Sequence, residues 1–209
     1  MWKRLNKLIK PNGAIVLFWS QPFTSALIMS NVNMFRYEII YEKNIASNFA
    51  FAKYWIMKFH ENILLFSNKK WKLATYNPQM TKWKPNNSVW SWIRKNITET
   101  TANTKIVSNK TDWLKHPKSV QKFNRETWLH PTQKPVALMK YLIKTYSHKN
   151  EVILDFTSGS WSTLIAAQNT WRKYIGIELD NNYYEISKKR LEENAIKIWL
   201  NTPNYYANW

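Results

Sequence analysis

The sequence contains no cysteine, so neither a disulfide bond nor a thiolate metal site can form. This absence is typical of proteins in a reducing compartment, and we expect a cytoplasmic location. No stretch approaches the roughly 18 apolar residues of a membrane-spanning helix. The apolar run at residues 14–19 is also shorter than the core of a signal peptide. The four histidines are not spaced as metal ligands, which predicts no metal site.

Acidic residues and glycine are scarce as well. The chain has 13 Asp and Glu against 31 Lys and Arg, a net charge of +18. Such an excess predicts attraction to a polyanion, with a solvated basic surface as the alternative. Three glycines stand beside thirteen tryptophans, and all eight prolines are single, so no Pro-Pro pair occurs. A length of 209 residues suits one domain, with or without an insert.

One stretch, EVILDFTSGSWSTLIAAQNTWRKYIGIEL at residues 151–179, has the layout of a nucleotide-binding βαβ unit. An apolar run ends at Asp155 and leads into a polar turn that contains Gly159. A helical pattern and a second apolar run follow, and the second run ends near Glu178. The turn and helix start offer N–H groups, and a strand-end carboxylate accepts bonds from ribose hydroxyls. A βαβ unit that serves packing alone is the alternative.

A second motif stands just upstream: LHPTQKP at residues 129–135, followed by a helical pattern at 136–146. Together with VILDFTSGS and IGIEL, this motif resembles the DNA amino-methyltransferases, which methylate adenine N6 or cytosine N4 with S-adenosylmethionine. GAIVLFWSQPF, FRYEIIYEK, HENILLF and TYNPQM resemble further segments of that family in the same order. The order is that of the permuted branch, in which the cofactor half follows the catalytic half.

The resemblance implies an α/β fold, a Rossmann-like methyltransferase sheet, and S-adenosylmethionine as the cofactor. It implies that His130, Thr132 and Lys134 approach the methionine end of the cofactor, where a lysine suits the carboxylate. Asp155 would orient the turn or accept from the cofactor's amino group, and Glu178 would hold the ribose. The implied cofactor-binding residues are His130, Thr132, Lys134, Asp155, Phe156, Gly159, Ser160 and Glu178.

Residues 67–128 lack sustained periodicity and carry thirteen Lys or Arg against three acidic residues, with aromatics interleaved. Cationic side chains contact phosphates, and flat rings stack on bases or wedge between them. Since the family places its target-recognition segment here, we expect a DNA-binding insert; a loosely packed basic loop is the alternative. The candidate DNA-binding residues are Lys82, Lys84, Arg94, Lys95, Lys115, Lys118 and Arg125.

The predicted organisation has four parts. Residues 1–66 form part of the catalytic half, 67–128 the basic insert, 129–197 the cofactor-binding half and 198–209 a tail. Strands are expected at residues 14–19, 37–42 and 62–66, and helices at 1–10, 22–29 and 136–144. The last helix, at 181–193, is expected to be capped by Asp180 or Asn181, with Tyr183, Ile186 and Leu191 facing the sheet.

The sequence departs from the family in two ways. Tryptophan stands at positions 19, 83, 161 and 171, where the family usually has glycine. Trp161 falls in the cofactor turn, so its indole must swing out to solvent or fill part of the cofactor cleft. The second departure is the absence of the family's catalytic tetrapeptide, Asp/Asn/Ser-Pro-Pro-aromatic, which grips the flipped base.

In the family's fold that tetrapeptide ends a strand between the strand at 14–19 and the strand at 152–154. We therefore expect an N-terminally shortened methyltransferase, with adenine N6 as the target of the complete enzyme and a place in restriction-modification. The chain is predicted to be inactive alone. Either the two strands close up, or a separate polypeptide supplies the missing strand, or the chain folds poorly. The alternatives are a non-catalytic DNA-binding remnant and methylation of another substrate such as RNA. Duplex DNA is the expected partner.

Overall fold

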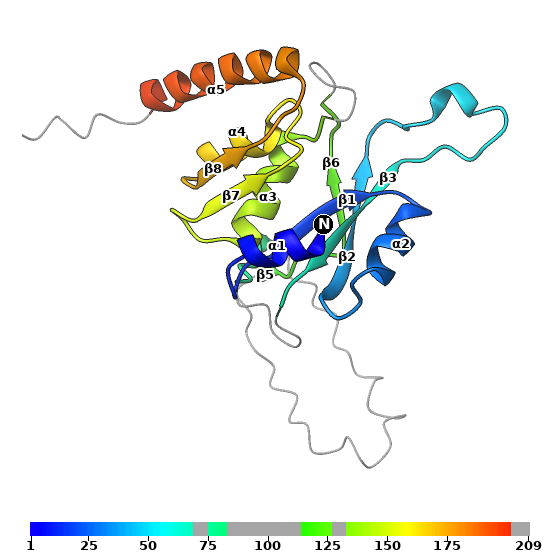
Figure 1. Cartoon of the computed structure of the whole chain (residues 1–209). Coiled ribbons are helices and arrows are strands. Elements are labelled where there is room, and N and C mark those ends of the chain that lie inside the picture. The colour runs from blue at the N-terminus through cyan, green and yellow to red at the C-terminus, as the bar shows by residue number, and fades with distance from the viewer. Residues whose placement is uncertain (69–74, 83–113, 127–132, 202–209) are drawn as a thin grey trace, which may run out of the picture. The chain divides into compact units, whose positions relative to one another are not determined.

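The structure, a computed structural model, describes residues 1–68, 75–82, 114–126 and 133–201 (Figure 1). The chain forms two compact units, Met1–Asn77 with Lys118–Trp209, and Pro78–Pro117. The elements in chain order are α1 (Trp2–Leu8), β1 (Ile15–Trp19), α2 (Phe23–Met29), β2 (Phe35–Lys43), a short 3-10 helix (Phe49–Phe51), β3 (His60–Phe66), β4 (Thr81–Lys82), β5 (Leu114–Lys115), β6 (Val120–Phe123), α3 (Val136–Tyr146), β7 (Val152–Asp155), α4 (Ser162–Gln168), β8 (Lys173–Gly176) and α5 (Asn181–Asn201).

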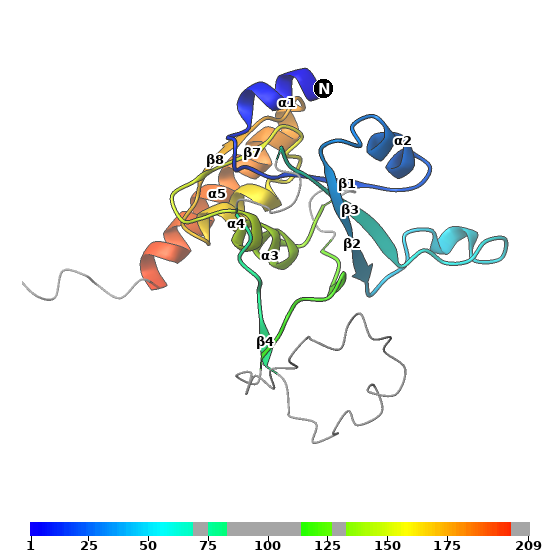
Figure 2. The ribbon, with the colours of Figure 1, turned by 90° about the horizontal axis from the view of Figure 1, so that it is seen from below.

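A four-stranded sheet in the order β1-β3-β2-β6 forms one half of the first unit. β3 lies antiparallel to both β1 and β2, and β6 lies parallel to β2. The run from Ile63 to Phe66 is fully buried because β3 is central and both of its faces are covered. α1 and α2 pack on one face, around Leu64 and Phe66, and α3 packs on the other, around Ile63 and Leu65 (Figure 2).

The second half of this unit is the βαβ segment that the sequence predicts. β7 and β8 form a parallel two-stranded sheet, and α4 is the crossover between them. Gly176 allows the close approach of this helix, because a Cβ at this position would overlap the Leu164 side chain. The predicted α/β class and the predicted βαβ segment are confirmed.

Helix α3 joins the two halves into one hydrophobic core. Its buried residues Leu138, Leu142 and Ile143 contact the four-stranded sheet, and Ala166 and Ala167 of α4 belong to the same cluster. The apolar residues of α3 recur at helical spacing, which is why one helix can serve both sides. The relative placement of the two sheets therefore depends on α3.

The second unit contributes a short antiparallel ladder of β4 and β5, in which Thr81 faces Lys115. Neither strand exceeds two residues, and both are exposed.

Among the helices that the structure describes, none is both long and apolar enough to cross a membrane.

The outer edge of β7 has no neighbouring strand in the described part of the chain. The Lys173 N–H donates to the Glu151 carbonyl and the Ile177 N–H to the Asp155 carbonyl, both at 2.9 Å. In a parallel ladder alternate residues bond the same neighbour. The backbone groups of Val152 and of Leu154, two residues on, therefore point away from β8.

The outer edge of β1 is open in the same way, again among the described residues. The Lys43 N–H donates to the Phe59 carbonyl at 2.7 Å. The odd-numbered residues of β3 therefore point their backbone N–H and C=O groups at β2, and the even-numbered residues point theirs at β1. The register pairs Leu17 with Leu64, which leaves the backbone of Val16 and Phe18 on the open side. That a further strand belongs between β1 and β7 stays a prediction.

Two of the tryptophans expected at glycine positions have left-handed backbone angles, Trp161 with a φ of 57° and Trp171 with a φ of 61°. A side chain in this region costs roughly 1–2 kcal/mol, a cost that glycine avoids. The resemblance and the backbone angles thus both favour glycine at positions 161 and 171.

Trp171→Gly is expected to raise the free energy of unfolding by about 1 kcal/mol, as urea denaturation would measure. The Trp171 side chain is 57% exposed, so its loss removes little packing while it relieves the strain. Asn150→Gly is the control, since Asn150 also has a positive φ, of 66°, but asparagine tolerates it well. A Trp171→Gly protein no more stable than the parent would contradict the expectation.

Candidate functional site

The turn after β7 is held by Asp155, one of the predicted site residues. One oxygen of its carboxylate accepts from the Thr157 N–H at 3.2 Å, and the other accepts from the Thr163 hydroxyl at the start of α4. The resemblance implies two roles for Asp155. These two hydrogen bonds are the contacts by which it would orient the turn. Gly159, further along, has a φ of 49°, which a residue with a Cβ adopts only with strain.

Glu178 follows β8 and lies beside the same turn. Its carboxylate accepts from the backbone N–H of Gly159 at 2.6 Å, of Leu179 at 3.0 Å and of Asp180 at 3.1 Å. A carboxylate has about four lone-pair directions, so these donors orient it without using its full capacity. Asp155 and Glu178 thus stand at the carboxyl ends of two adjacent parallel strands, the usual place for a ligand in such sheets.

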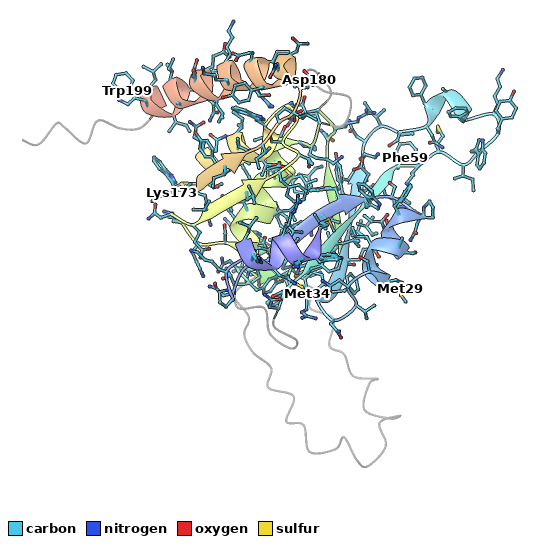
Figure 3. The ribbon with its side chains drawn as sticks, in the orientation of Figure 1. Met29, Met34, Phe59, Lys173, Asp180 and Trp199 are labelled. Carbon is cyan, nitrogen blue, oxygen red and sulfur yellow. The ribbon has the colours of Figure 1, made fainter. Side chains whose placement is uncertain are left out.

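Phe156 and Ser160 complete the turn in different ways. Phe156 is exposed, whereas Ser160 is buried. The Ser160 carbonyl accepts from the guanidinium of Arg190 at 2.6 Å, and the Ser187 hydroxyl donates to the Gly159 carbonyl at 2.9 Å. Helix α5, which begins beside Asp180 (Figure 3), therefore fixes the turn from behind through polar contacts.

Trp161 does not swing out to solvent, because it is only 6% exposed. Its indole packs with Leu164, Ile165 and Leu191, and its ring meets that of Tyr184 edge-on at 5.3 Å between centroids. The indole N–H is buried with no hydrogen-bond partner in the described residues. The solvent-facing alternative for this side chain is therefore wrong.

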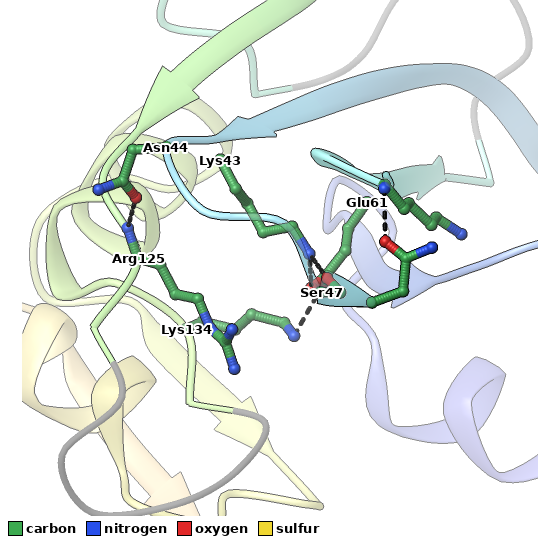
Figure 4. Close-up of polar contacts among 8 residues, drawn as sticks. Lys43, Asn44, Ser47, Glu61, Arg125 and Lys134 are labelled. Carbon is green, nitrogen blue, oxygen red and sulfur yellow. Dashed lines mark hydrogen bonds and ion pairs between the residues drawn. The ribbon is translucent and has the colours of Figure 1, made fainter. Parts of the chain in front are cut away.

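Lys134 lies in a partly buried ionic cluster (Figure 4). Its ammonium is 2.8 Å from Glu61 of β3 and stands over the Phe18 ring at 5.4 Å from the centroid. Lys43, at the end of β2, is 3.2 Å from the other Glu61 oxygen and also contacts the Ser47 hydroxyl. The cluster ties the segment before α3 to the four-stranded sheet.

Burial alone would raise the pKa of Glu61, but Lys134 and then Lys43 attract its charge and donate hydrogen bonds to it. Their combined effect holds this pKa below the ordinary value of 4.5. A lowered pKa stabilises the folded state fully above the unfolded pKa, and the contribution is lost as the pH falls through the folded pKa. Glu61 is therefore charged at neutral pH.

Glu61→Gln is expected to cost about 2 kcal/mol of unfolding free energy at pH 7, since hydrogen bonds to a charged group are lost. The difference from the parent protein should shrink as the pH falls below about 4.5, because the parent then protonates Glu61 itself. Urea denaturation between pH 7 and pH 3 measures it. Glu42→Gln is the matched control, as Glu42 pairs with Lys122 at 3.2 Å on the surface. A difference that stays constant with pH would contradict the expectation.

The other predicted residues are distributed over both units or lie outside the described residues. His130, Thr132, Lys84, Arg94 and Lys95 lie outside them. Lys82 on β4 and Lys115 on β5 are exposed residues of the second unit, and Lys118 is exposed before β6. The Arg125 N–H donates to the Asn44 side chain at 2.8 Å. Their roles in DNA binding stay predictions.

The comparisons with known proteins agree on one family. A sequence model described as DNA methylase matches residues 1–189. The type II methyltransferase M.HinfI of Haemophilus influenzae is 28% identical over 202 residues, 92% of this chain and 50% of the relative. The DNA adenine methyltransferase YhdJ of Escherichia coli K12 is 38% identical over 84 residues, 37% of this chain and 29% of the relative. The chain thus spans half or less of the length of these relatives.

Solved structures give the same result. The M1.HpyAVI–SAM complex superposes with a TM-score of 0.61 and 25% identity, over 90% of this chain and 79% of that one. The PvuII cytosine-N4-specific DNA methyltransferase superposes with a TM-score of 0.61 over 96% of this chain and 75% of that one. At 15% identity the second likeness shows the fold alone.

Proposed function

The chain belongs to the N6/N4 DNA methylase family, and from that premise we propose that it serves in the methylation of DNA. The methyl donor is S-adenosylmethionine, and the acceptor is the exocyclic N6 amino group of adenine. One relative is named a DNA adenine methyltransferase, which supports the choice of base. The observation that carries the proposal is the pair of carboxylates, Asp155 and Glu178, at the ends of adjacent parallel strands around a glycine turn.

The residues at this site fit the nucleoside half of the cofactor. Glu178 is a fixed, charged acceptor suited to ribose hydroxyls, because three N–H groups already orient it. Phe156 is an exposed apolar side chain in the same turn, and Gly159, with its φ of 49°, lets the turn form without strain. The cofactor itself supplies an electrophilic methyl group on a sulfonium sulfur.

The chain's own residues position these groups and exclude water. Asp155 holds the turn through Thr157 and Thr163, and Arg190 holds it from α5 through the Ser160 carbonyl. Trp161 fills the space behind the turn, so water is excluded from that side. Because these parts are fixed before a ligand arrives, binding does not require their ordering.

The DNA partner is supported by the charge of the chain, +18, which favours phosphate contacts. We assign these contacts to the basic residues of the insert and its borders: Lys82, Lys84, Arg94, Lys95, Lys115, Lys118 and Arg125. Replacing one of these basic residues with a neutral residue should weaken binding to all DNA sequences alike, and it should make the affinity for DNA less dependent on salt concentration.

We further propose that the 209 residues are inactive alone. The sequence has no Pro-Pro pair and so lacks the tetrapeptide that grips the flipped base. The open edges of β1 and β7 favour a strand from polypeptide outside these residues. A non-catalytic DNA-binding protein is the second candidate, and the same absence of the tetrapeptide favours it.

Transfer of labelled methyl groups from S-adenosylmethionine to duplex DNA tests both proposals. The chain should give no transfer alone and clear transfer when joined to, or co-expressed with, a segment that carries an Asp-Pro-Pro-Tyr tetrapeptide. Chromatography of the digested DNA then distinguishes N6-methyladenine from N4-methylcytosine. Transfer by the chain alone would refute the inactivity, and DNA binding without transfer in every combination would favour the second candidate.

A further inference from the structure

The segment between β2 and β3, residues 44–59, exposes many large apolar side chains beyond the ends of these strands (Figure 1). We call this segment the β2–β3 loop. Its exposed apolar residues include Phe49, Phe51, Tyr54, Trp55, Ile56 and Met57. Tyr54 is 81% exposed and Ile56 is 96% exposed, and neither belongs to a hydrophobic core cluster of the described residues. Soluble proteins rarely expose so many apolar side chains together unless these side chains bind something.

The backbone of the β2–β3 loop is held in place by polar contacts between its two arms. The Asn48 carboxamide donates to the Ile56 carbonyl at 3.1 Å and accepts from the Lys58 N–H at 2.7 Å. The Ser47 N–H donates to the Lys58 carbonyl at 3.0 Å. Because the arms are tied together before a ligand arrives, binding does not require their ordering.

The charge of the β2–β3 loop has one sign. Lys53 and Lys58 are its only charged residues, and it contains no Asp or Glu. Neither lysine pairs with a carboxylate within the part of the chain that the structure describes. Trp55 borders two shallow hollows, one lined also by Lys53 and the other by Asn48 and Phe51. Ammonium groups beside accessible flat rings suit a ligand that carries both phosphates and planar bases.

We propose that the β2–β3 loop binds DNA by stacking the Trp55 ring on a base that has lost its stacking neighbour, while Lys53 and Lys58 contact the adjacent phosphates. Such bases arise when a nucleotide is turned out of the duplex, and aromatic side chains stack on them whatever the sequence. The contact is separate from those assigned to the basic insert, and it adds affinity without reading sequence. This inference rests on the proposed function, because it concerns the same DNA partner.

The test measures the binding of two labelled single strands of equal length to the full 209-residue chain by fluorescence anisotropy. One strand is oligodeoxythymidine, and the other has the same phosphates but abasic sugars throughout. Trp55→Ala should weaken the binding of the first strand about tenfold, as the loss of one stacking contact predicts, and leave that of the abasic strand unchanged. Trp199→Ala is the matched control and should alter neither affinity, since Trp199 is 75% exposed and Trp55 is 69% exposed.

A second variant separates the charge of the loop from its stacking. Lys53→Gln should weaken the binding of both strands alike, because both carry the phosphates that Lys53 is proposed to contact. It should also make both affinities less dependent on salt concentration. A Lys53→Gln protein that loses affinity for oligodeoxythymidine alone would contradict the role assigned to this lysine.

The ratio of the two affinities within one protein is the decisive quantity, because partial unfolding lowers both affinities equally. A Trp55→Ala ratio equal to that of the parent would overturn this inference, while methyl transfer by the chain joined to the tetrapeptide segment would still support the proposed function. A parent chain that binds neither strand would overturn both. Sedimentation velocity tests the competing occupant: a parent that self-associates, a Trp55→Ala protein that does not and an unchanged ratio would assign the loop to a second copy of the chain instead.

Discussion

Replacing Glu178 with alanine is expected to lower the affinity for S-adenosylmethionine by about 100-fold. The substitution removes the acceptor that we assign to the ribose hydroxyls, and each hydrogen bond to a charged group contributes roughly 1.5–3 kcal/mol. It also leaves the Gly159, Leu179 and Asp180 N–H groups without their acceptor, so the turn loses its orientation. Calorimetric titration measures the loss.

Glu185→Ala is the control for this change, because Glu185 is an exposed carboxylate on α5 in the same region of the sequence. It should leave the affinity unaltered. The affinity for 5′-methylthioadenosine should fall with that for S-adenosylmethionine in Glu178→Ala, since both ligands share the ribose. An unchanged affinity for either ligand would remove Glu178 from the site.

Leu138→Ala is expected to lower the free energy of unfolding by about 4 kcal/mol. Leu138 is 0% exposed and lies in the cluster that contains residues of β2, β3, α3 and α4. Its truncation leaves a cavity where the four-stranded sheet meets the cofactor half. The surrounding structure cannot close this cavity easily, because two sheets and a helix would have to move together.

Urea denaturation measures this change, and Leu200→Ala near the exposed end of α5 is the matched control (beside Trp199 in Figure 3). The control should stay within about 0.5 kcal/mol of the parent. If Leu138→Ala cost no more than Leu200→Ala, α3 would not be the element that joins the two halves. A selective loss of cofactor binding at an unchanged unfolding midpoint would also contradict its role.

The local parts of the fold and site were predictable from the sequence. The strand ending at Asp155, the turn at Gly159 and the strand before Glu178 lie within one short segment, and their spacing determines their geometry. The cap of α5 is local as well: the Asp180 side chain accepts from the N–H groups of Asn182 and Tyr183 at 2.8 and 3.1 Å.

The ionic cluster was not predicted, because it joins β2, β3 and the segment before α3. A signal was nevertheless present in FRYEIIYEK. Ile39, Tyr41 and Lys43 alternate on one face of β2, so a lysine falls at a buried position. A buried lysine requires a carboxylate nearby, and Glu61 in HENILLF is the residue that meets this need.

The rotation of α5 was predicted incorrectly. Leu191 is buried as expected, but Ile186 is 44% exposed and Ser187 takes the buried position. The physical reason is that α5 contacts the cofactor turn through hydrogen bonds from Ser187 and Arg190 to backbone carbonyls. An apolar pattern could not reveal this, since the contacts that set the helix rotation are polar.

The open edges of β1 and β7, at Val16, Phe18, Val152 and Leu154, lack a neighbouring strand among the residues that the structure describes, and this bears on how the polypeptide survives after synthesis. An exposed strand edge is a template for any extended chain, including a second copy that is only partly folded. Until these amides are covered, pairing with other chains competes with folding to the native state. If a further strand pairs with these edges, as we propose, supplying that strand should raise the yield of soluble protein, whether or not any DNA is methylated.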